Sequence, residues 1–271
     1  MKLSVIIPIY NEINTIDIVL RKVTTALPHI PKEIILVDDG SQDGTREWLI
    51  ENFGNPREKP VKMTLSPDHP FLSPETNNLV SISSQTKTAT NQTAAVSFKV
   101  IFHAVNQGKG ASLCTGFQEA SGDIFVIQDA DLEYDPQDWQ KMWQLIIDAK
   151  ADVVYGSRFY GNPHRVLYFY HLLGNKIITT LVNLASNTTF TDIEVCYKMF
   201  RREVLDDISL TCKDFGFEVE FTIKVACSPC RWRLYETGIS YYGRSYEEGK
   251  KINWTDGVKA LWYILKFRLI R

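Results

Sequence analysis

The positions of the hydrophobic residues follow a repeating pattern through residues 1–156. Residues 3–9 form an aliphatic run without alternation, which is typical of a parallel strand buried on both faces. Residues 14–27 place apolar side chains at helical spacing, and Pro28 marks the end of that helix. The two patterns recur and predict strands over 33–37, 99–105, 123–128 and 152–156, and helices over 45–52, 109–120 and 136–149. This alternation predicts an α/β fold with a doubly wound, mostly parallel sheet and helices on both faces.

Two regions depart from this pattern. Residues 55–97 are rich in Ser, Thr, Asn, Gln and Pro and show no period, so we expect a mobile surface insertion before the third strand. Residues 159–271 are less regular, with helices predicted over 168–187, 217–227 and 254–271 and extended segments over 196–200 and 232–242. We expect one domain over residues 1–271, because a chain of this length can bury a single large core.

The last predicted helix has a broad apolar face with basic residues around it. The face comprises Trp254, Val258, Leu261, Trp262, Leu265 and Leu269, and the basic residues are Lys259, Lys266, Arg268 and Arg271. Such a face either packs on the core, as most amphipathic helices do, or lies on an anionic membrane surface. The sequence leaves both possibilities open, and it says nothing of oligomeric state.

Charge and composition exclude several classes of protein. The net charge of −2 argues against a nucleic-acid partner. No apolar stretch reaches the ~18 residues of a membrane span, and the N-terminal run reads as a strand rather than a signal peptide. We therefore expect the chain to fold in the cytoplasm, where its five cysteines stay reduced. The single C-x-x-C pair, Cys227 and Cys230, offers too few ligands for a closed zinc site.

Charged residues follow the predicted strands at the sheet edge where open α/β sheets bind ligands. They are Glu12, Asp38 and Asp39, Lys109 between Gly108 and Gly110, Asp129, Asp131 and Glu133, and Arg158. Like charges gathered at one edge raise the electrostatic energy of the fold unless a cation or a ligand compensates them. This grouping indicates a ligand site rather than a structural feature.

Asp129-x-Asp131 is the most informative of these features. Two carboxylates one residue apart after a buried strand can hold one hard cation, and Mg²⁺ or Mn²⁺ commonly uses one or two carboxylates together with substrate phosphates. Glu133 is placed to complete the set. A lone D-x-D could equally cap the next helix, but the other charged strand ends favour a metal site.

Asp38 and Asp39 suit either a nucleotide or a tight turn. A carboxylate after the second strand can bind the ribose or the base, and D-D-G-S is also a good turn sequence. The Gly108-Lys109-Gly110 loop can approach a phosphate closely. A Walker loop and a G-x-G-x-x-G fingerprint are both absent from the sequence, which argues against a P-loop ATPase and a nicotinamide enzyme.

Taken together, these residues resemble those of family 2 glycosyltransferases with the GT-A fold. The shared motifs are V-I-I-P-x-Y-N-E at 5–12, V-D-D-G-S at 37–41, N-x-G-K-G at 106–110, D-A-D at 129–131 and G-S-R at 156–158. The sequence is most similar to soluble members of the dolichyl-phosphate mannose synthase-like branch, through 171–176, 191–198 and 241–252. The resemblance covers nearly the whole chain except the insertion.

The resemblance implies a role for each motif. Residues 1–158 would form the nucleotide-sugar-binding half and residues 159–271 the acceptor half. Pro8, Tyr10, Glu12, Asp38 and Asp39 would hold the nucleotide, Asp129, Asp131 and Glu133 would surround the metal and the diphosphate, and Arg158, Arg165 and Arg244 would meet an acceptor phosphate. Two positions depart from the branch: Glu133 stands where glutamine is common, and Asp192–Tyr197 replaces the usual D-P-T-S-G-F.

The implied activity is transfer of a hexose from a nucleotide sugar, of the GDP-mannose or UDP-glucose type, to a polyprenyl or dolichyl phosphate with inversion. The cofactor would be a divalent cation, Mg²⁺ or Mn²⁺, and the reaction would take place at the cytoplasmic membrane face. Lys109, Lys250 and Lys251 add positive charge for phosphate groups. If the acceptor is instead a hydroxyl on a glycan or small molecule, Asp192 and Glu194 are the candidate bases. A third possibility is a nucleotide-sugar-binding module without turnover.

Overall fold

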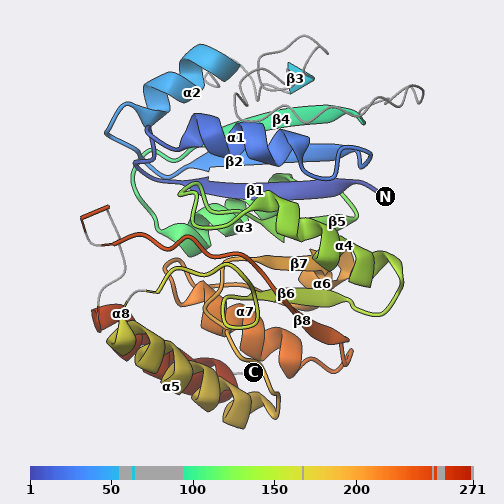
Figure 1. The fold of residues 1–271 in the computed structure, drawn as a ribbon, viewed down its shortest axis with the longest axis vertical. Coiled ribbons are helices and arrows are strands. Elements are labelled where there is room, and N and C mark those ends of the chain that lie inside the picture. The colour runs from blue at the N-terminus through green and yellow to red at the C-terminus, as the bar shows by residue number, and fades with distance from the viewer. Residues whose placement is uncertain (55–62, 65–93, 167, 246, 249–253, 270–271) are drawn as a thin grey trace.

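The computed structural model describes all residues except 55–62, 65–93, 167, 246, 249–253 and 270–271. An eight-stranded sheet crosses the molecule in the order β3-β4-β2-β1-β5-β7-β6-β8 (Figure 1). The strands are β1 Leu3–Ile9, β2 Lys32–Asp38, β3 Met63–Thr64, β4 Val96–Phe102, β5 Ile124–Ile127, β6 Val153–Ser157, β7 Lys198–Arg201 and β8 Leu234–Gly238. The helices are α1 Ile16–Thr25, α2 Thr45–Phe53, α3 Lys109–Glu119, α4 Trp139–Ile147, α5 Phe169–Ser186, α6 Arg202–Asp207, α7 Phe217–Ala226 and α8 Trp254–Leu269.

The sheet is parallel except at two strands. β1 pairs in parallel with β2 and β5, and β2 with β4, so the polar residues that follow these strands meet at one edge. β7 runs antiparallel between β5 and β6, and the two-residue β3 runs antiparallel to β4. The predicted parallel arrangement therefore holds for β1, β2, β4 and β5, and β7 is then inserted as one reversed strand.

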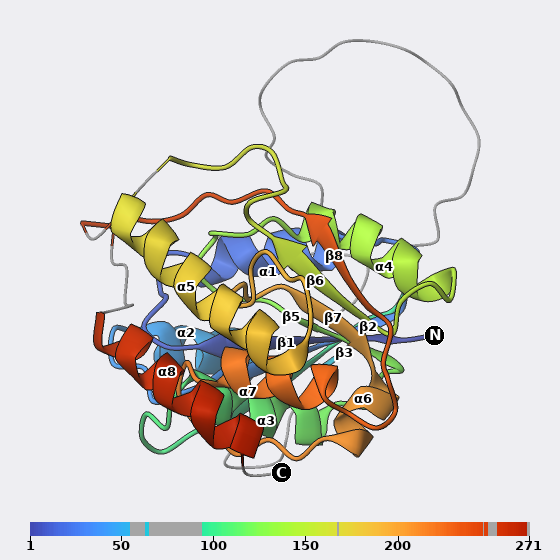
Figure 2. The same cartoon turned by 90° about the horizontal axis from the view of Figure 1, so that it is seen from below.

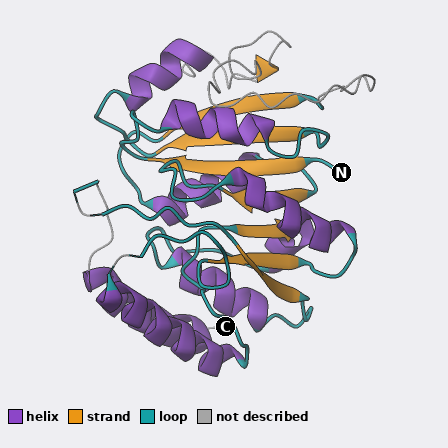
Figure 3. Cartoon of the chain, in the orientation of Figure 1, coloured by secondary structure: helices purple, strands orange, loops and turns teal. Residues whose placement is uncertain are grey.

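Helices cover both faces of the sheet. In Figure 2, where the sheet is seen from its edge, α1 and α4 lie on one face, and α3, α6 and α7 lie on the other. Gly116 lets α3 approach the sheet closely, because a Cβ atom there would stand 2.4 Å from the Ile6 side chain. α5 and α8 pack side by side beyond the last strands, as Figure 3 also shows.

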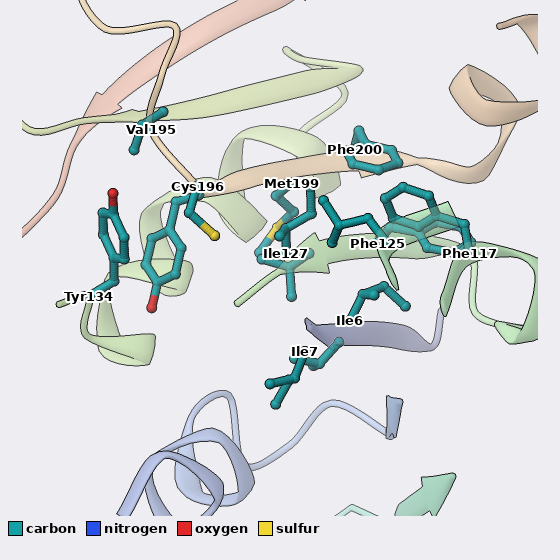
Figure 4. Close-up of a cluster of buried hydrophobic side chains, with 14 of the residues drawn as sticks. Ile6, Ile7, Phe117, Phe125, Ile127, Tyr134, Val195, Cys196, Met199 and Phe200 are labelled. Atoms are coloured by element: carbon teal, nitrogen blue, oxygen red, sulfur yellow. The ribbon is translucent and has the colours of Figure 1, made fainter. Parts of the chain in front are cut away.

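Aromatic rings bind the reversed strand to the parallel part of the sheet. Phe125 on β5 stacks on Phe200 on β7 at a centroid distance of 5.7 Å, and Phe117 on α3 packs edge-on against both (Figure 4). Each such pair contributes about 0.5–1.5 kcal/mol beyond the burial of its surface. This packing fixes β7 beside β5, and so places the segment before β7 near the residues that follow β5.

Several sequence expectations need correction. β4 ends at Phe102 rather than at residue 105, and the His103 N–H, which donates to the Asp38 carbonyl (2.8 Å), makes the last backbone hydrogen bond to β2. The short helix α6 was not predicted. The expected insertion contains β3, and its predicted mobility concerns residues that lie outside the described part of the chain.

The final helix buries a different face from the one its apolar pattern suggested. Ala260, Ile264 and Phe267 are buried, whereas Leu261, Trp262 and Leu265 are 41, 64 and 58% exposed. Among the described residues, no helix has the length and apolar character needed to span a membrane.

Candidate active site

Asp38, at the end of β2, is fully buried and paired with a cation. Its carboxylate accepts a hydrogen bond from Arg46 Nε on α2 at 2.7 Å and from the backbone N–H of Ser41 at 3.3 Å. The Arg46 guanidinium lies 5.3 Å from the centre of the Phe102 ring, and its side chain is 26% exposed. Arg46, which sequence reasoning missed, is thus the member of this pair that faces solvent.

Asp39 holds the glycine-lysine loop against the sheet. Its carboxylate lies 2.7 Å from His103 Nδ1 and accepts the backbone N–H groups of Gln107 (2.9 Å) and Gly108 (2.8 Å). Gly108 has a φ of 99°, and a Cβ atom there would stand 2.4 Å from the Lys213 carbonyl oxygen. Asp39 and this glycine together fix the start of α3, and with it the position of Lys109.

Lys109 lies in a buried chain of alternating charges. Its Nζ is 2.8 Å from Asp129 and 3.5 Å from Glu218, and Glu218 in turn contacts Lys198. Burial alone would lower the pKa of Lys109, but the carboxylates of Asp129 and Glu218 hold it well above its usual value. These carboxylates therefore favour the charged form of Lys109 beside Asp129. The sequence predicted Lys109 and Asp129, but gave no sign of Glu218 on α7.

Asp131 and Glu133 meet an arginine from the far end of the chain. Arg244 Nη2 lies 3.1 Å from Asp131 and 3.3 Å from Glu12, and Arg244 Nε lies 3.8 Å from Glu133. Two backbone contacts place this arginine, since the N–H groups of Tyr242 and Arg244 donate to the carbonyl (2.8 Å) and carboxylate (2.7 Å) of Glu133. One guanidinium thus lies among three carboxylates from two strand ends.

The carboxylates at this edge suit a hard divalent cation. Burial, and after it the neighbouring charges of Asp129 and Glu133, raise the pKa of Asp131 to about 7, with Arg244 opposing the shift. The described residues include no group of three His, Cys, Asp or Glu side chains arranged to hold a metal unaided. The three predicted ligands, Asp129, Asp131 and Glu133, thus do not lie together as such a group. Mg²⁺ and Mn²⁺ commonly use only one or two carboxylates, together with ligand phosphates.

On the acceptor side, Arg158 and Asp192 form a buried bidentate pair. Arg158 Nε and Nη2 donate to the Asp192 carboxylate at 2.6 and 2.7 Å, and Asn175 on α5 donates to it at 2.9 Å. Burial opposes ionisation of Asp192, but Arg158 outweighs it and lowers the pKa of this carboxyl. Arg158 is also 5.3 Å from the centre of the Tyr241 ring. Asp192 is therefore occupied in orienting Arg158.

Glu194 stands apart from these pairs. It forms no hydrogen bond or ion pair with any residue that the structure describes. Burial raises the pKa of its carboxyl to about 7, with Arg158 opposing and Asp192 adding to the shift. A carboxyl of this kind can exchange a proton near neutral pH.

Five further predicted residues are part-exposed or lie outside the described part of the chain. Arg165 is 45% exposed and donates to Glu248 at 2.6 Å and to the Gly243 carbonyl at 3.1 Å. Pro8 and Tyr10 are part-exposed at the end of β1. Lys250 and Lys251 are outside the described residues. Glu12, Asp131, Glu133 and Arg244 are in direct contact, as are Lys109 and Asp129. Tyr241 links the Arg158–Asp192 pair to the first group, because its hydroxyl donates to Glu133 at 3.2 Å and the Arg158 guanidinium lies beside its ring.

Comparison with known proteins assigns the chain to one family. A family model described as "Glycosyl transferase family 2" matches residues 4–67 and 83–209. The chain is 29% identical over 255 residues to dolichol-phosphate mannosyltransferase of Pyrococcus furiosus, an alignment that covers 93% of this chain and 61% of that one. It is 26% identical over 215 residues to undecaprenyl-phosphate 4-deoxy-4-formamido-L-arabinose transferase of Salmonella choleraesuis, covering 79% and 52%. The chain thus spans about half to three fifths of these relatives.

The fold is also similar to that of solved structures. Glucosyl-3-phosphoglycerate synthase from Mycobacterium tuberculosis, in complex with Mn²⁺, UDP and phosphoglyceric acid, superposes with a TM-score of 0.65 at 16% identity. The superposition covers 100% of this chain and 79% of that one. The predicted GT-A fold class is confirmed.

Proposed function

The chain belongs to glycosyl transferase family 2, and on that premise we propose that it transfers a hexose from a nucleotide sugar to a polyprenyl phosphate, with inversion at the anomeric carbon. The observation that carries the proposal is the position of Arg244. It contacts Glu12, Asp131 and Glu133. An arginine expected at the acceptor phosphate therefore lies next to the acids expected around the nucleotide and the donor diphosphate.

The donor half, residues 1–158, would bind the nucleotide and the diphosphate. Asp129, Asp131 and Glu133 would hold a divalent cation, Mg²⁺ or Mn²⁺, whose charge stabilises the departing nucleoside diphosphate. Lys109 adds a fixed positive charge next to Asp129. Pro8, Tyr10 and Glu12 would contact the nucleotide, with Asp38 acting through Arg46 and Asp39 through the 107–108 backbone.

The acceptor half, residues 159–271, together with Arg158 at the end of β6, would bind the lipid phosphate. Arg158 and Arg244 can each donate to phosphate oxygens, and Arg165 and Lys251 would extend the positive rim. One phosphate oxygen attacks the anomeric carbon while the bond from that carbon to the diphosphate oxygen breaks. No base is needed, because the attacking phosphate is already ionised.

The relatives support the acceptor in this proposal. By name, one acts on dolichol phosphate and the other on undecaprenyl phosphate, and both are polyprenyl phosphates. The Mn²⁺ and UDP in the structural neighbour agree with the donor and the cation. Because polyprenyl phosphates reside in membranes, we place the reaction at a membrane surface. All five cysteines are free, which agrees with the reducing cytoplasmic side.

A hydroxyl acceptor is the second candidate, and Glu194 is the observation that favours it. Of the two candidate bases, Asp192 is engaged with Arg158 and Asn175, whereas Glu194 has no hydrogen-bond partner among the described residues. With a pKa of about 7, Glu194 could accept the proton of an attacking hydroxyl.

Labelled nucleotide sugars would distinguish these functions. We would incubate the protein with each donor, Mn²⁺ or Mg²⁺, and either polyprenyl phosphate or a saccharide mixture, and then partition the products between organic solvent and water. We expect label in the organic phase, dependent on both the metal and Asp131. Label only on a saccharide would establish the second candidate. Binding of donor without turnover on any acceptor would leave a nucleotide-sugar-binding module.

A further inference from the structure

Glu218, on α7, has one carboxylate oxygen without a hydrogen bond. Its Oε2 contacts the ammonium group of Lys198, whereas its Oε1 is buried and has no hydrogen-bond partner among the described residues. Such an oxygen costs free energy, because it has lost its hydrogen bonds to water without a replacement. Lys109 Nζ lies 3.5 Å from Oε1, just beyond the usual length of a hydrogen bond. Glu218 therefore offers Lys109 an acceptor that Lys109 does not use.

Lys109 instead occupies the carboxylate of Asp129. Its Nζ lies 2.8 Å from one oxygen of Asp129 and 3.0 Å from the other. Lys109 must give up at least one of these oxygens for Asp129 to bind a divalent cation, and the two positive charges repel each other. Its side chain is only 14% exposed, and an ammonium group away from water is costly without a carboxylate. Lys109 then needs another partner.

The row of charges becomes more buried from Asp129 inward. The exposed fractions of the side chains are 20% for Asp129, 14% for Lys109, 7% for Glu218 and 0% for Lys198. Asp129 is thus the member of the row that a ligand can reach from solvent, and Glu218 lies deeper. Lys198 also donates to the Ile193 carbonyl at 3.2 Å, which holds it in place on the other oxygen of Glu218. Oε1 is therefore left for Lys109.

The backbone around Lys109 is fixed, so its side chain can change partner alone. Lys109 is the first residue of α3, and Glu218 lies in the first turn of α7. The starts of the two helices are joined, since the N–H of Ala111 donates to the Lys213 carbonyl at 3.0 Å. Both carboxylates lie within 3.5 Å of the same Nζ atom. A move from Asp129 to Glu218 therefore needs only rotation within the Lys109 side chain.

We propose that Glu218 is a positioning residue of the donor site, which receives Lys109 when Asp129 binds a divalent cation. Lys109 and Glu218 then form an ion pair beside the site, and the Asp129 carboxylate is free to act as a ligand. The exchange transfers no proton and breaks no covalent bond. The role at the cation rests on the proposed function, whereas the ability of Lys109 to change partner does not.

A double-mutant cycle without metal or nucleotide tests the change of partner. Asp129→Asn and Glu218→Gln each leave Lys109 one of its two carboxylates, whereas the double variant leaves it none. We expect the loss of thermal midpoint in the double variant to exceed the sum of the two single changes by roughly 2–4 °C. The matched control uses Glu220→Gln, which alters a buried carboxylate of α7 that pairs with Lys224, and its changes should add to those of Asp129→Asn. Additive changes in the Glu218 cycle would overturn the proposal.

A crystal structure of Asp129→Asn gives a second test that does not depend on the stability of a Glu218 variant. We expect Lys109 Nζ to lie within about 3 Å of Glu218 Oε1. A Lys109 side chain that stays at residue 129, with a water molecule bound to Glu218 Oε1, would overturn the proposal.

Manganese binding then tests the role at the donor site. Free Mn²⁺ is measured by electron paramagnetic resonance with UDP or GDP present. Glu218→Gln should weaken nucleotide-dependent Mn²⁺ binding by roughly tenfold, because Lys109 then holds Asp129 more firmly. In a Lys109→Met background the same substitution should change Mn²⁺ binding by less than about twofold.

Equal weakening in both backgrounds would show that Glu218 acts only through its charge, and would overturn its positioning role. If the wild type binds no Mn²⁺ with either nucleotide, the cation of the proposed function fails. The double-mutant cycle and the Asp129→Asn structure would still decide whether Lys109 changes partner.

Discussion

Every carboxylate that we assign to the donor half has a partner within the protein, whereas in the acceptor half Glu194 has none among the described residues. Asp38, Asp39 and Asp129 pair with cationic or histidine side chains of their own half. Asp131 and Glu133 instead depend on Arg244, from the acceptor half. Glu12, Asp131 and Glu133 are therefore balanced by a cation only when the two halves meet. Single substitutions can therefore distinguish carboxylates that have a partner in their own half from those that are paired across the two halves or have no partner among the described residues.

The largest effect should follow removal of Asp131. We expect Asp131→Ala to lower the transfer rate by about 10³-fold, because the charge that holds the cation and the diphosphate is lost. Asp131→Asn, which keeps the shape of the side chain, should lose nearly as much. Both variants should keep the wild-type circular dichroism spectrum. Steady-state turnover measures the effect, and an active Asp131→Ala protein would refute the metal assignment.

Breaking the pair on the acceptor side should mainly reduce stability. Asp192→Asn leaves the Arg158 guanidinium without its bidentate carboxylate in a buried position. Such a loss costs about 3 kcal/mol, because the remaining charge stays unpaired away from water. Urea denaturation measures this, and the double variant Asp192→Asn/Arg158→Gln should recover part of the loss. A single variant as stable as the wild type would show that the pair is not needed for the fold.

Glu194→Gln separates the two acceptors by its pH profile. The pKa of Glu194 rises from 4.5 to about 7 on folding, so the folded state loses stability as pH rises through this interval. The glutamine variant lacks this loss and should be more stable than the wild type above pH 7, by about 2 kcal/mol. With a lipid-phosphate acceptor its rate should be unchanged. A rate on a hydroxyl acceptor that increases across pH 7 in the wild type, and falls at least about 10²-fold in the variant, would favour the second candidate.

The smallest effect concerns the rim. Arg165 and Glu248 form an ion pair in which both side chains are about half exposed, at 45 and 48%. Solvent screens such pairs, so Glu248→Gln should leave the thermal midpoint unchanged within error. If Arg165 meets the acceptor phosphate, the same variant should lower the KM for lipid phosphate or leave it unchanged. A strongly destabilised Glu248→Gln protein would contradict this description of the rim.

The sequence predicted the donor half well because strand order places its chemistry. Residues 3–9 were expected as a strand and form β1, and the parallel neighbours of β1 bring Glu12, Asp38 and Asp129 to one edge. Such positions follow from the backbone alone. The direction in which these side chains point does not follow from the backbone. The pairing of Asp38 with Arg46 could therefore not be predicted from the sequence.

The acceptor half was less predictable, because long-range contacts define it. Arg244 is 113 residues from its partner Asp131, and no local pattern indicates that contact. The sequence also left open whether the apolar face of α8 that it identified is buried or exposed. Apolar residues lie on both sides of that helix, and only the packing of Ile264 and Phe267 against the protein determines which side is buried. Predicting the contact of Arg244 and the buried face of α8 would both have required knowing which elements of the fold pack against them.

Manganese binding tests the central claim most directly. Free Mn²⁺ would be measured by electron paramagnetic resonance as the protein is added, with and without a nucleoside diphosphate, for the wild type and Asp131→Ala. We predict weak binding of Mn²⁺ alone, much tighter binding with the nucleotide, and loss of this increase in Asp131→Ala. Nucleotide-dependent Mn²⁺ binding that is equally tight in Asp131→Ala would contradict the assignment of the carboxylates after β5 to a cation shared with the donor diphosphate.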